Sequence, residues 1–172
     1  MSRASFTAAG HYLQEQMALL STANLHRQSG CANWDEQHLI NHVAQVANAV
    51  CETAGGAPFA VPKQAETIAS TPKEAASSVE HALDLLESGP MLNMASIEFT
   101  AHGWDLGIGM DPQHRIPEEL AEKVLELARG MLTDELRGSH FAPRRQVPES
   151  TNASDRLVAF LGRVPPGQAN NQ

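Results

Sequence analysis

The chain has 172 residues, 42% of them hydrophobic, and a formal net charge of −8 from 20 acidic and 12 basic side chains. This length is enough for one domain with a proper core, and the acidic balance argues against a nucleic-acid-binding surface. No apolar run approaches the roughly 18 residues of a membrane span, and residues 1–9 lack the apolar segment of a signal peptide. We therefore expect a single cytoplasmic domain over residues 1–172 with no nucleic-acid or membrane partner. Its tail from residue 165 is expected to be disordered, and Cys31 and Cys51 are expected to be free thiols.

The residue pattern predicts an all-α fold, because strand-forming runs are scarce whereas Ala, Leu, Glu and Gln are frequent. The first helix is expected over about residues 5–21, where apolar residues recur at helical spacing. Asp35 can cap a second helix, and Trp34 just before it can anchor the chain against the other helices. The glycines at 55–56 end this helix, and residues 54–70 are expected to form a loop.

Two histidines on the second helix, His38 and His42, lie four residues apart. At about 100° per residue, His42 falls beside the apolar stripe and His38 falls further toward solvent. A pair at this spacing can bind metal by itself, but the periodicity favours His42 as the inward residue. We therefore expect His38 to lie at the rim of any site. The stripe consists of Leu39, Val43, Val46 and Val50.

The remaining helices have clear start and stop signals. A capping box over residues 71–74 begins the third helix, and Gly89–Pro90 ends it. The fourth is expected over about 91–110, the fifth from Pro117, and a short one over about 153–161. Four helices of this length, joined in part by a long connection, fit an antiparallel four-helix bundle with additional C-terminal helices.

The most informative stretch, residues 97–106 in the fourth helix, reads IEFTAHGWDL. Glu98 and His102 are four residues apart, so their side chains lie one above the other on a helix. Together with Asp105 they fall among apolar residues, roughly opposite a face of small and polar residues that includes Thr100. A carboxylate and an imidazole are costly to bury unless they are paired, hydrogen-bonded or bound to a metal. The stretch therefore indicates a metal site, a buried Glu–His ion pair, or a helix end that is in contact with solvent.

Helical bundles build metal sites from side chains that project inward from facing helices. His42 from the second helix can converge in this way with Glu98 and His102 from the fourth. Two histidines and one glutamate leave a position open on zinc, as catalytic sites do, and nickel or iron accepts the same ligands. The other histidines lie on predicted polar faces or in loops and are expected to be solvated; they are His11, His26, His81, His114 and His140.

Several motifs carry a resemblance to a known family: CANW at residues 31–34, HLINHV at 38–43 and EFTAHGWDL at 98–106. Residues 141–163 add FAP, VP, DRL and FLGR. Together these motifs resemble the DinB-like superfamily, and within it the branch related to mycothiol-dependent maleylpyruvate isomerase. The similarity extends over about residues 6–165.

The resemblance implies a four-helix bundle that holds a divalent metal through His42, Glu98 and His102, the same residues that the helical periodicity favours. It also implies that a low-molecular-weight thiol, mycothiol, occupies the open metal position. A metal-bound thiol deprotonates and can attack a small electrophile. The expected function is thus a mycothiol-dependent S-transferase or isomerase with zinc, or else nickel or iron, as its metal; a homodimer is compatible with the sequence. Asp105 is expected to orient a histidine, and Cys31 is expected to be a small packed residue.

Some positions depart from the family pattern. Ser29–Gly30 stands in place of the usual Thr–Pro, Gln37–His38 in place of Arg–Asp, and Gly107–Ile108 in place of Ala–Arg. The lost basic residues could remove contacts to a polar thiol or an acidic substrate. We also expect no counterpart of the isomerase's additional C-terminal domain, so maleylpyruvate is not implied as the substrate. Two other functions stay open. One is a hydrolase or lyase that uses metal-bound water, with Asp105 or His38 as a proton shuttle, and the other is a non-catalytic bundle that binds metal or a small ligand.

Overall fold

The computed structural model describes residues 2–56, 70–133, 137 and 141–168, and over these residues it contains six α-helices and no β-strand. The prediction of an all-α fold is confirmed for this part of the chain. The helices start and end close to the predicted residues: α1 (Arg3–Ala18), α2 (Glu36–Ala54), α3 (Pro72–Leu85), α4 (Pro90–Met110), α5 (Glu118–Met131) and α7 (Ala153–Phe160).

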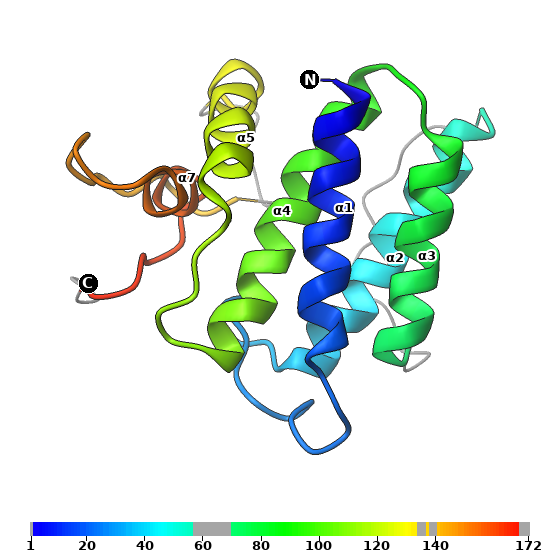
Figure 1. Ribbon diagram of the computed structural model, residues 1–172, viewed down its shortest axis with the longest axis horizontal. Coiled ribbons are helices and arrows are strands. Elements are labelled where there is room, and N and C mark those ends of the chain that lie inside the picture. Colours follow the sequence, from blue (N-terminus) through cyan, green and yellow to red (C-terminus); the bar gives the residue numbers. More distant parts are fainter. Residues whose placement is uncertain (1, 57–69, 134–136, 138–140, 169–172) are drawn as a thin grey trace.

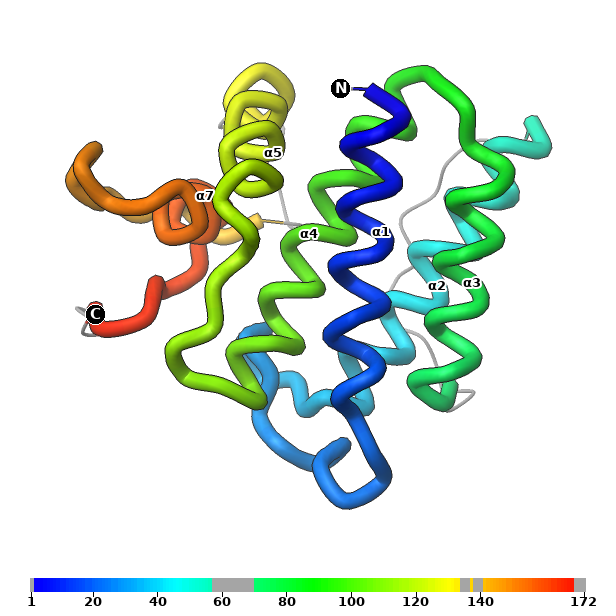
Figure 2. The backbone as a smooth tube through the Cα atoms, in the orientation of Figure 1, coloured from blue at the N-terminus to red at the C-terminus, as the bar shows by residue number. Residues whose placement is uncertain are grey.

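Four helices, α1 to α4, form a bundle, α5 packs beside α4, and α7 packs against α5 at the side of the molecule (Figure 1). The chain descends along α1, rises along α2 and α3, and descends again along α4 (Figure 2). Neighbours α1 and α4 therefore run parallel, as do α2 and α3, so the expected antiparallel arrangement is found between the two pairs and not within them. A connection as long as that between Ala54 and Pro72 lets two consecutive helices run in the same direction.

The helices begin at the residues that their capping signals predict. Asp35 accepts a hydrogen bond from the His38 backbone N–H at the start of α2. At the start of α3, Thr71 and Glu74 form the predicted capping box, in which each side chain accepts from the other's backbone N–H. These caps satisfy N–H groups that otherwise have no partner within the helix.

Helix α4 is the centre of the fold and is buried around most of its circumference. Ser96 and Thr100, on the face expected to be polar, are completely buried, so that face is not a solvent face. Gly103 on the same side lies against the ring of Tyr12 from α1, and a Cβ atom there would approach the ring to 2.6 Å. The missing side chain thus lets α1 pack closely on α4, which leaves the opposite face of α4 toward α2.

The C-terminal segment is tied to the start of α5 by three polar contacts. The Arg115 guanidinium lies 2.8 Å from Asp155, the Ile116 N–H donates to Ser154 Oγ at 2.9 Å, and Glu118 accepts from the first N–H of α7. This attachment places the residues after α7 beside the C-terminal half of α4 (Figure 1).

Some predictions lie outside the described residues, namely most of the loop at 54–70, His140 and the end of the tail. Residues 165–168 are described and follow the last helix as turn and irregular structure. None of the helices in the described part combines the length and the hydropathy that a membrane span requires.

Candidate metal centre

The three predicted ligands come together between α2 and α4. Ligand atoms of His42, Glu98 and His102 lie within 4.8 Å of one another. His102 Nε2 is 3.2 Å from Glu98 Oε2, and the rings of the two histidines meet edge to face with centroids 4.9 Å apart. The i,i+4 spacing brings Glu98 and His102 together on α4, and His42 joins them from α2, although it lies 56 positions before Glu98 in the sequence. We call these three residues the ligand triad.

The central ligand atom of this cluster, His102 Nε2, lies 3.2 Å from Glu98 Oε2 but makes no well-aligned hydrogen bond. His102 is 6% exposed, and its Nε2 is a buried polar atom. A buried polar atom left unpaired costs about 1–3 kcal/mol. A divalent cation between these atoms would satisfy Nε2 and balance the Glu98 charge, so the residues present fit a metal ion.

His42 is suited to act as a neutral ligand. Its ring is half-buried and packs against the edge of Trp34, with centroids 5.0 Å apart. Burial, and then the charge of His102, lower the pKa of His42 to about 4. The imidazole is therefore neutral at pH 7, which is the form that binds metals.

Charges around His102 favour its protonated form when no metal is bound. Burial opposes protonation, but contacts to Asp105, Cys31 and Glu98 outweigh it and raise the pKa of His102. Burial likewise opposes ionisation of Glu98, but the pKa of that carboxyl is lowered by its contact with His102. In the metal-free protein, protonated His102 therefore lies between the carboxylates of Glu98 and Asp105. A bound metal ion would supply positive charge at the same place.

A second polar cluster lies on the other side of the His102 ring. Asp105 is completely buried, and its Oδ2 accepts from His102 Nδ1 at 3.1 Å and from Cys31 Sγ at 3.2 Å. Arg163 donates from Nη2 to Oδ2 at 2.6 Å and from Nε to Oδ1 at 3.0 Å. Burial disfavours the charged form of Asp105, but the guanidinium outweighs it and holds the pKa of this carboxyl well below its usual range.

Cys31, His102 and Asp105 also lie close enough to hold an ion. Here, however, both oxygens of Asp105 are already bound by a guanidinium, which is a fixed positive charge. Burial, and then the charge of Asp105, raise the pKa of Cys31, so the thiol is kept from the thiolate form that binds metals. The ligand triad is therefore the better metal site of the two.

The remaining histidines follow the prediction with one exception. His38 has a side chain 63% exposed, hydrogen-bonded through Nδ1 to Asp35 at 2.6 Å, and it is not part of either cluster. His114 was expected to be solvated, but it is half-buried, and its Nε2 is hydrogen-bonded to the Tyr12 hydroxyl at 2.7 Å. It packs over Gly107, which has no side chain to exclude the ring. The three other described histidines, His11, His26 and His81, are exposed as expected.

Two residues of the site region were not predicted from the sequence. Arg163 lies 58 positions after its partner Asp105, too far for any periodicity to connect them. Glu36 is completely buried at the start of α2, with neither carboxyl oxygen hydrogen-bonded, although its place in the first turn is also a common place for a solvated acid. The burial of both depends on tertiary packing against α4.

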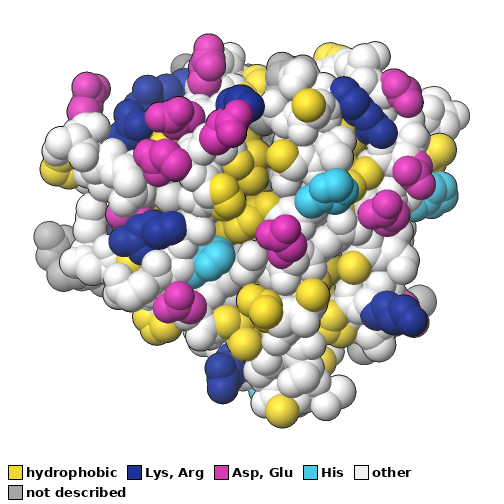
Figure 3. Space-filling model, in the orientation of Figure 1, with side chains coloured by type: hydrophobic (Ala, Val, Ile, Leu, Met, Phe, Trp, Pro, Cys, Tyr) yellow, Lys and Arg dark blue, Asp and Glu magenta, His cyan; other side chains and the backbone are white. Residues whose placement is uncertain are grey.

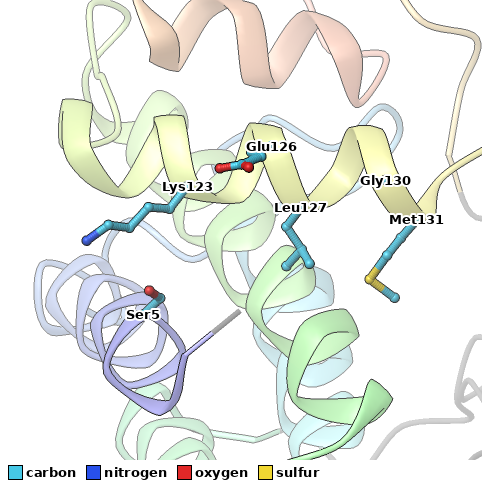
Figure 4. A pocket seen from close by; sticks show the side chains of 6 residues that line it. All are labelled: Ser5, Lys123, Glu126, Leu127, Gly130 and Met131. Atoms are coloured by element: carbon cyan, nitrogen blue, oxygen red, sulfur yellow. The ribbon is translucent and has the colours of Figure 1, made fainter.

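An open pocket of about 500 Å³ lies elsewhere, between α1 and α5 (Figure 4). Apolar side chains gather in this region of the surface (Figure 3). No residue of the ligand triad lines the pocket, and its charged residues, Lys123 and Glu126, are exposed. Its buried polar side chain, Ser5, is hydrogen-bonded to Ser2, so the lining shows no group of buried polar side chains like that at the triad. The full lining is Ser5, Lys123, Glu126, Leu127, Gly130 and Met131.

In comparisons with known proteins, no family model matches the chain, and neither a curated protein nor a solved structure is significantly similar to it.

Proposed function

We propose that the protein is a metal-dependent enzyme of the DinB-like type, in which the ligand triad holds one divalent ion and a small thiol is the nucleophile. The observation that carries the proposal is the convergence of ligand atoms from His42, Glu98 and His102 within 4.8 Å, with the buried Nε2 of His102 lacking a well-aligned hydrogen bond. Zinc is the first choice, because two imidazoles and a carboxylate form one of its usual catalytic ligand sets, and nickel or iron accepts the same donors. When bound, such an ion lowers the pKa of a thiol or water in its remaining position and so supplies a nucleophile at neutral pH.

The absence of a suitable protein nucleophile among the described residues near the triad supports an external thiol. Cys31 is the nearest thiol, but its Sγ donates to Asp105 on the Nδ1 side of the His102 ring. Burial raises the pKa of this thiol, and a protonated thiol is a poor nucleophile. The motif resemblance supports mycothiol as the thiol, with S-transfer to a small electrophile or isomerisation as the reaction.

Three residues around the triad are proposed to orient its ligands or to transfer protons. Trp34 packs on the ring of His42 and limits its orientation. Asp105 fixes His102 through Nδ1, and its complete burial and pairing with Arg163 argue against a role as a mobile proton shuttle. We assign the exchange of protons with solvent to His38, because its side chain is exposed and its ring is held by Asp35.

The test is an activity assay of protein stripped of metal by a chelator and reloaded separately with Zn²⁺, Ni²⁺ or Fe²⁺. Mycothiol and a chromogenic aryl halide serve as thiol and electrophile. We expect turnover that requires both the metal and the thiol, and a loss of about 100-fold or more in Glu98→Gln. The exposed histidine variant His81→Gln is the matched control and is expected to retain full activity.

Other outcomes separate the alternatives. Metal-dependent turnover of esters or amides without thiol would contradict the thiol step and indicate a hydrolase or lyase that uses metal-bound water. Stoichiometric metal binding without turnover of any electrophile tested would indicate a binding module. Failure of the protein to bind any of the three metals would overturn the proposal as a whole.

A further inference from the structure

The site contains a buried ion pair that joins α4 to the end of the described chain. Asp105 is completely buried, the Arg163 side chain is 14% exposed, and two parallel hydrogen bonds of 2.6 and 3.0 Å connect them. Bidentate pairing of this kind fixes both the position and the plane of a carboxylate. Removing this ion pair from water costs free energy, and apolar side chains of similar volume could fill the same space. We therefore looked for a role of the pair at the neighbouring metal ligand.

Local structure after α7 directs Arg163 toward α4. The backbone turns at Gly162, which has a φ of +88° and lies so close to Ala142 that a Cβ atom would approach it to 2.7 Å. The Arg163 N–H then donates to the Val158 carbonyl, and its Nη1 donates to the Leu161 carbonyl at 3.2 Å. The guanidinium is therefore held by its own segment before it reaches Asp105.

Hydrogen bonding at Asp105 determines which nitrogen of His102 carries a proton. Arg163 has only donors and keeps its charge, and Cys31 donates its S–H, so the Asp105 carboxylate is an acceptor only. His102 Nδ1, at 3.1 Å from the same oxygen, must then be the protonated nitrogen of a neutral ring. This leaves Nε2, the atom in the ligand triad, with a free lone pair.

We propose that Arg163 is a positioning residue of the metal centre, which acts through Asp105 to hold His102 in the tautomer that binds metal through Nε2. This inference rests on the proposed function, because it assumes the ligand triad as the metal site. Without the guanidinium, Asp105 would be a buried carboxylate with no fixed cation. The plane of its carboxylate would then no longer be fixed, so its hydrogen bond to His102 Nδ1, which holds the orientation and tautomer of that ring, would be weakened.

The experiment compares the wild type with Arg163→Gln, Arg163→Lys and a matched control, Arg115→Gln. Arg115 forms the other ion pair that anchors the C-terminal segment, with Asp155, and does not contact the site. Zn²⁺ affinity is measured by competition with a chelator. The protonated nitrogen of His102 is identified by NMR of ¹⁵N-histidine-labelled, metal-free protein over a pH series from neutral to alkaline.

We expect Arg163→Gln to weaken Zn²⁺ binding about 10- to 100-fold and to abolish the preference for Nδ1–H in neutral His102. Arg163→Lys, which keeps the charge but not the bidentate geometry, should recover part of both. Arg115→Gln should change neither, even where it lowers thermal stability.

Wild-type Zn²⁺ affinity together with an unchanged tautomer in Arg163→Gln would overturn the inference and leave Arg163 as a structural tether. If Arg163→Gln does not fold, the same two readouts in Arg163→Lys decide the question. If the wild type binds no Zn²⁺, the proposed function fails, and the tautomer in the metal-free protein still shows whether Arg163 positions His102.

Discussion

Replacing Glu36 with Gln is expected to change how the stability of the fold depends on pH. The side chain is completely buried, and neither carboxyl oxygen has a hydrogen-bond partner. It lies against the backbone of Gly109 on α4, where a Cβ atom would collide with Oε1. Burial, together with the negative charges of Asp105 and Asp35, raises the pKa of Glu36 to about 8, and Arg27 opposes this only in part.

The magnitude follows from the two pKa values. In the unfolded chain the Glu36 carboxyl loses its proton near 4.5, but in the folded protein it does so near 8. Between these pH values the folded state binds the additional proton, so the free energy of unfolding falls as the pH rises and levels off above about pH 8. At about 1.4 kcal/mol per pKa unit the full effect is about 5 kcal/mol, and relaxation around the charge reduces it, so we expect a loss of about 2–5 kcal/mol.

The assay is urea unfolding of the wild type and Glu36→Gln, followed by circular dichroism at a series of pH values from mildly acidic to mildly alkaline. Because Gln has the same shape and does not titrate, the difference between the two proteins isolates Glu36 from all other groups. Glu36→Gln should gain stability relative to the wild type as the pH rises. Two curves that stay parallel over the whole series would refute the burial of an uncompensated carboxyl at this position.

The remaining predictions concern the site and the core. Replacing His42, Glu98 or His102 individually with Ala should abolish metal binding but leave a helical fold, since the apolar core does not depend on them; loss of the far-ultraviolet circular dichroism signal in all three would instead indicate a structural role. His38→Ala should keep metal near wild-type occupancy and lose activity only in part, with a shifted pH profile, because the ring of His38 is exposed and outside the triad. If His38→Ala instead lost its metal as completely as His42→Ala, the metal ligands would have to be reassigned to the two α2 histidines. Gly103→Ala should destabilise the fold by about 1–3 kcal/mol in urea unfolding, because the added Cβ meets the α1 tyrosine ring at 2.6 Å; an unchanged midpoint would contradict the close packing of α1 on α4.

Much of the fold could be predicted because its signals are local. The caps at Asp35 and Thr71 act within one helical turn, and the observed helices begin there. Helix direction is not a local property, and the parallel arrangement of α2 and α3 was not predicted for that reason. The burial of Thr100 was missed for a related reason, because a helical wheel assumes one solvent face, whereas α4 has neighbours on several sides.

In the candidate site, too, the features set by local spacing could be predicted and those set by tertiary packing could not. Glu98 and His102 could be paired from their i,i+4 spacing, and the α2 stripe favoured His42 over His38. The Arg163 contact could not be predicted, because it depends on how the segment after α7 packs against α4.

The most direct test of the central claim is the number of divalent ions that the metal-free protein takes up, measured by elemental analysis after dialysis against Zn²⁺. The ligand triad predicts about one ion per chain in the wild type and none retained in Glu98→Ala. Absence of zinc from the wild type after this treatment, or equal retention in both proteins, would contradict a metal centre formed by His42, Glu98 and His102.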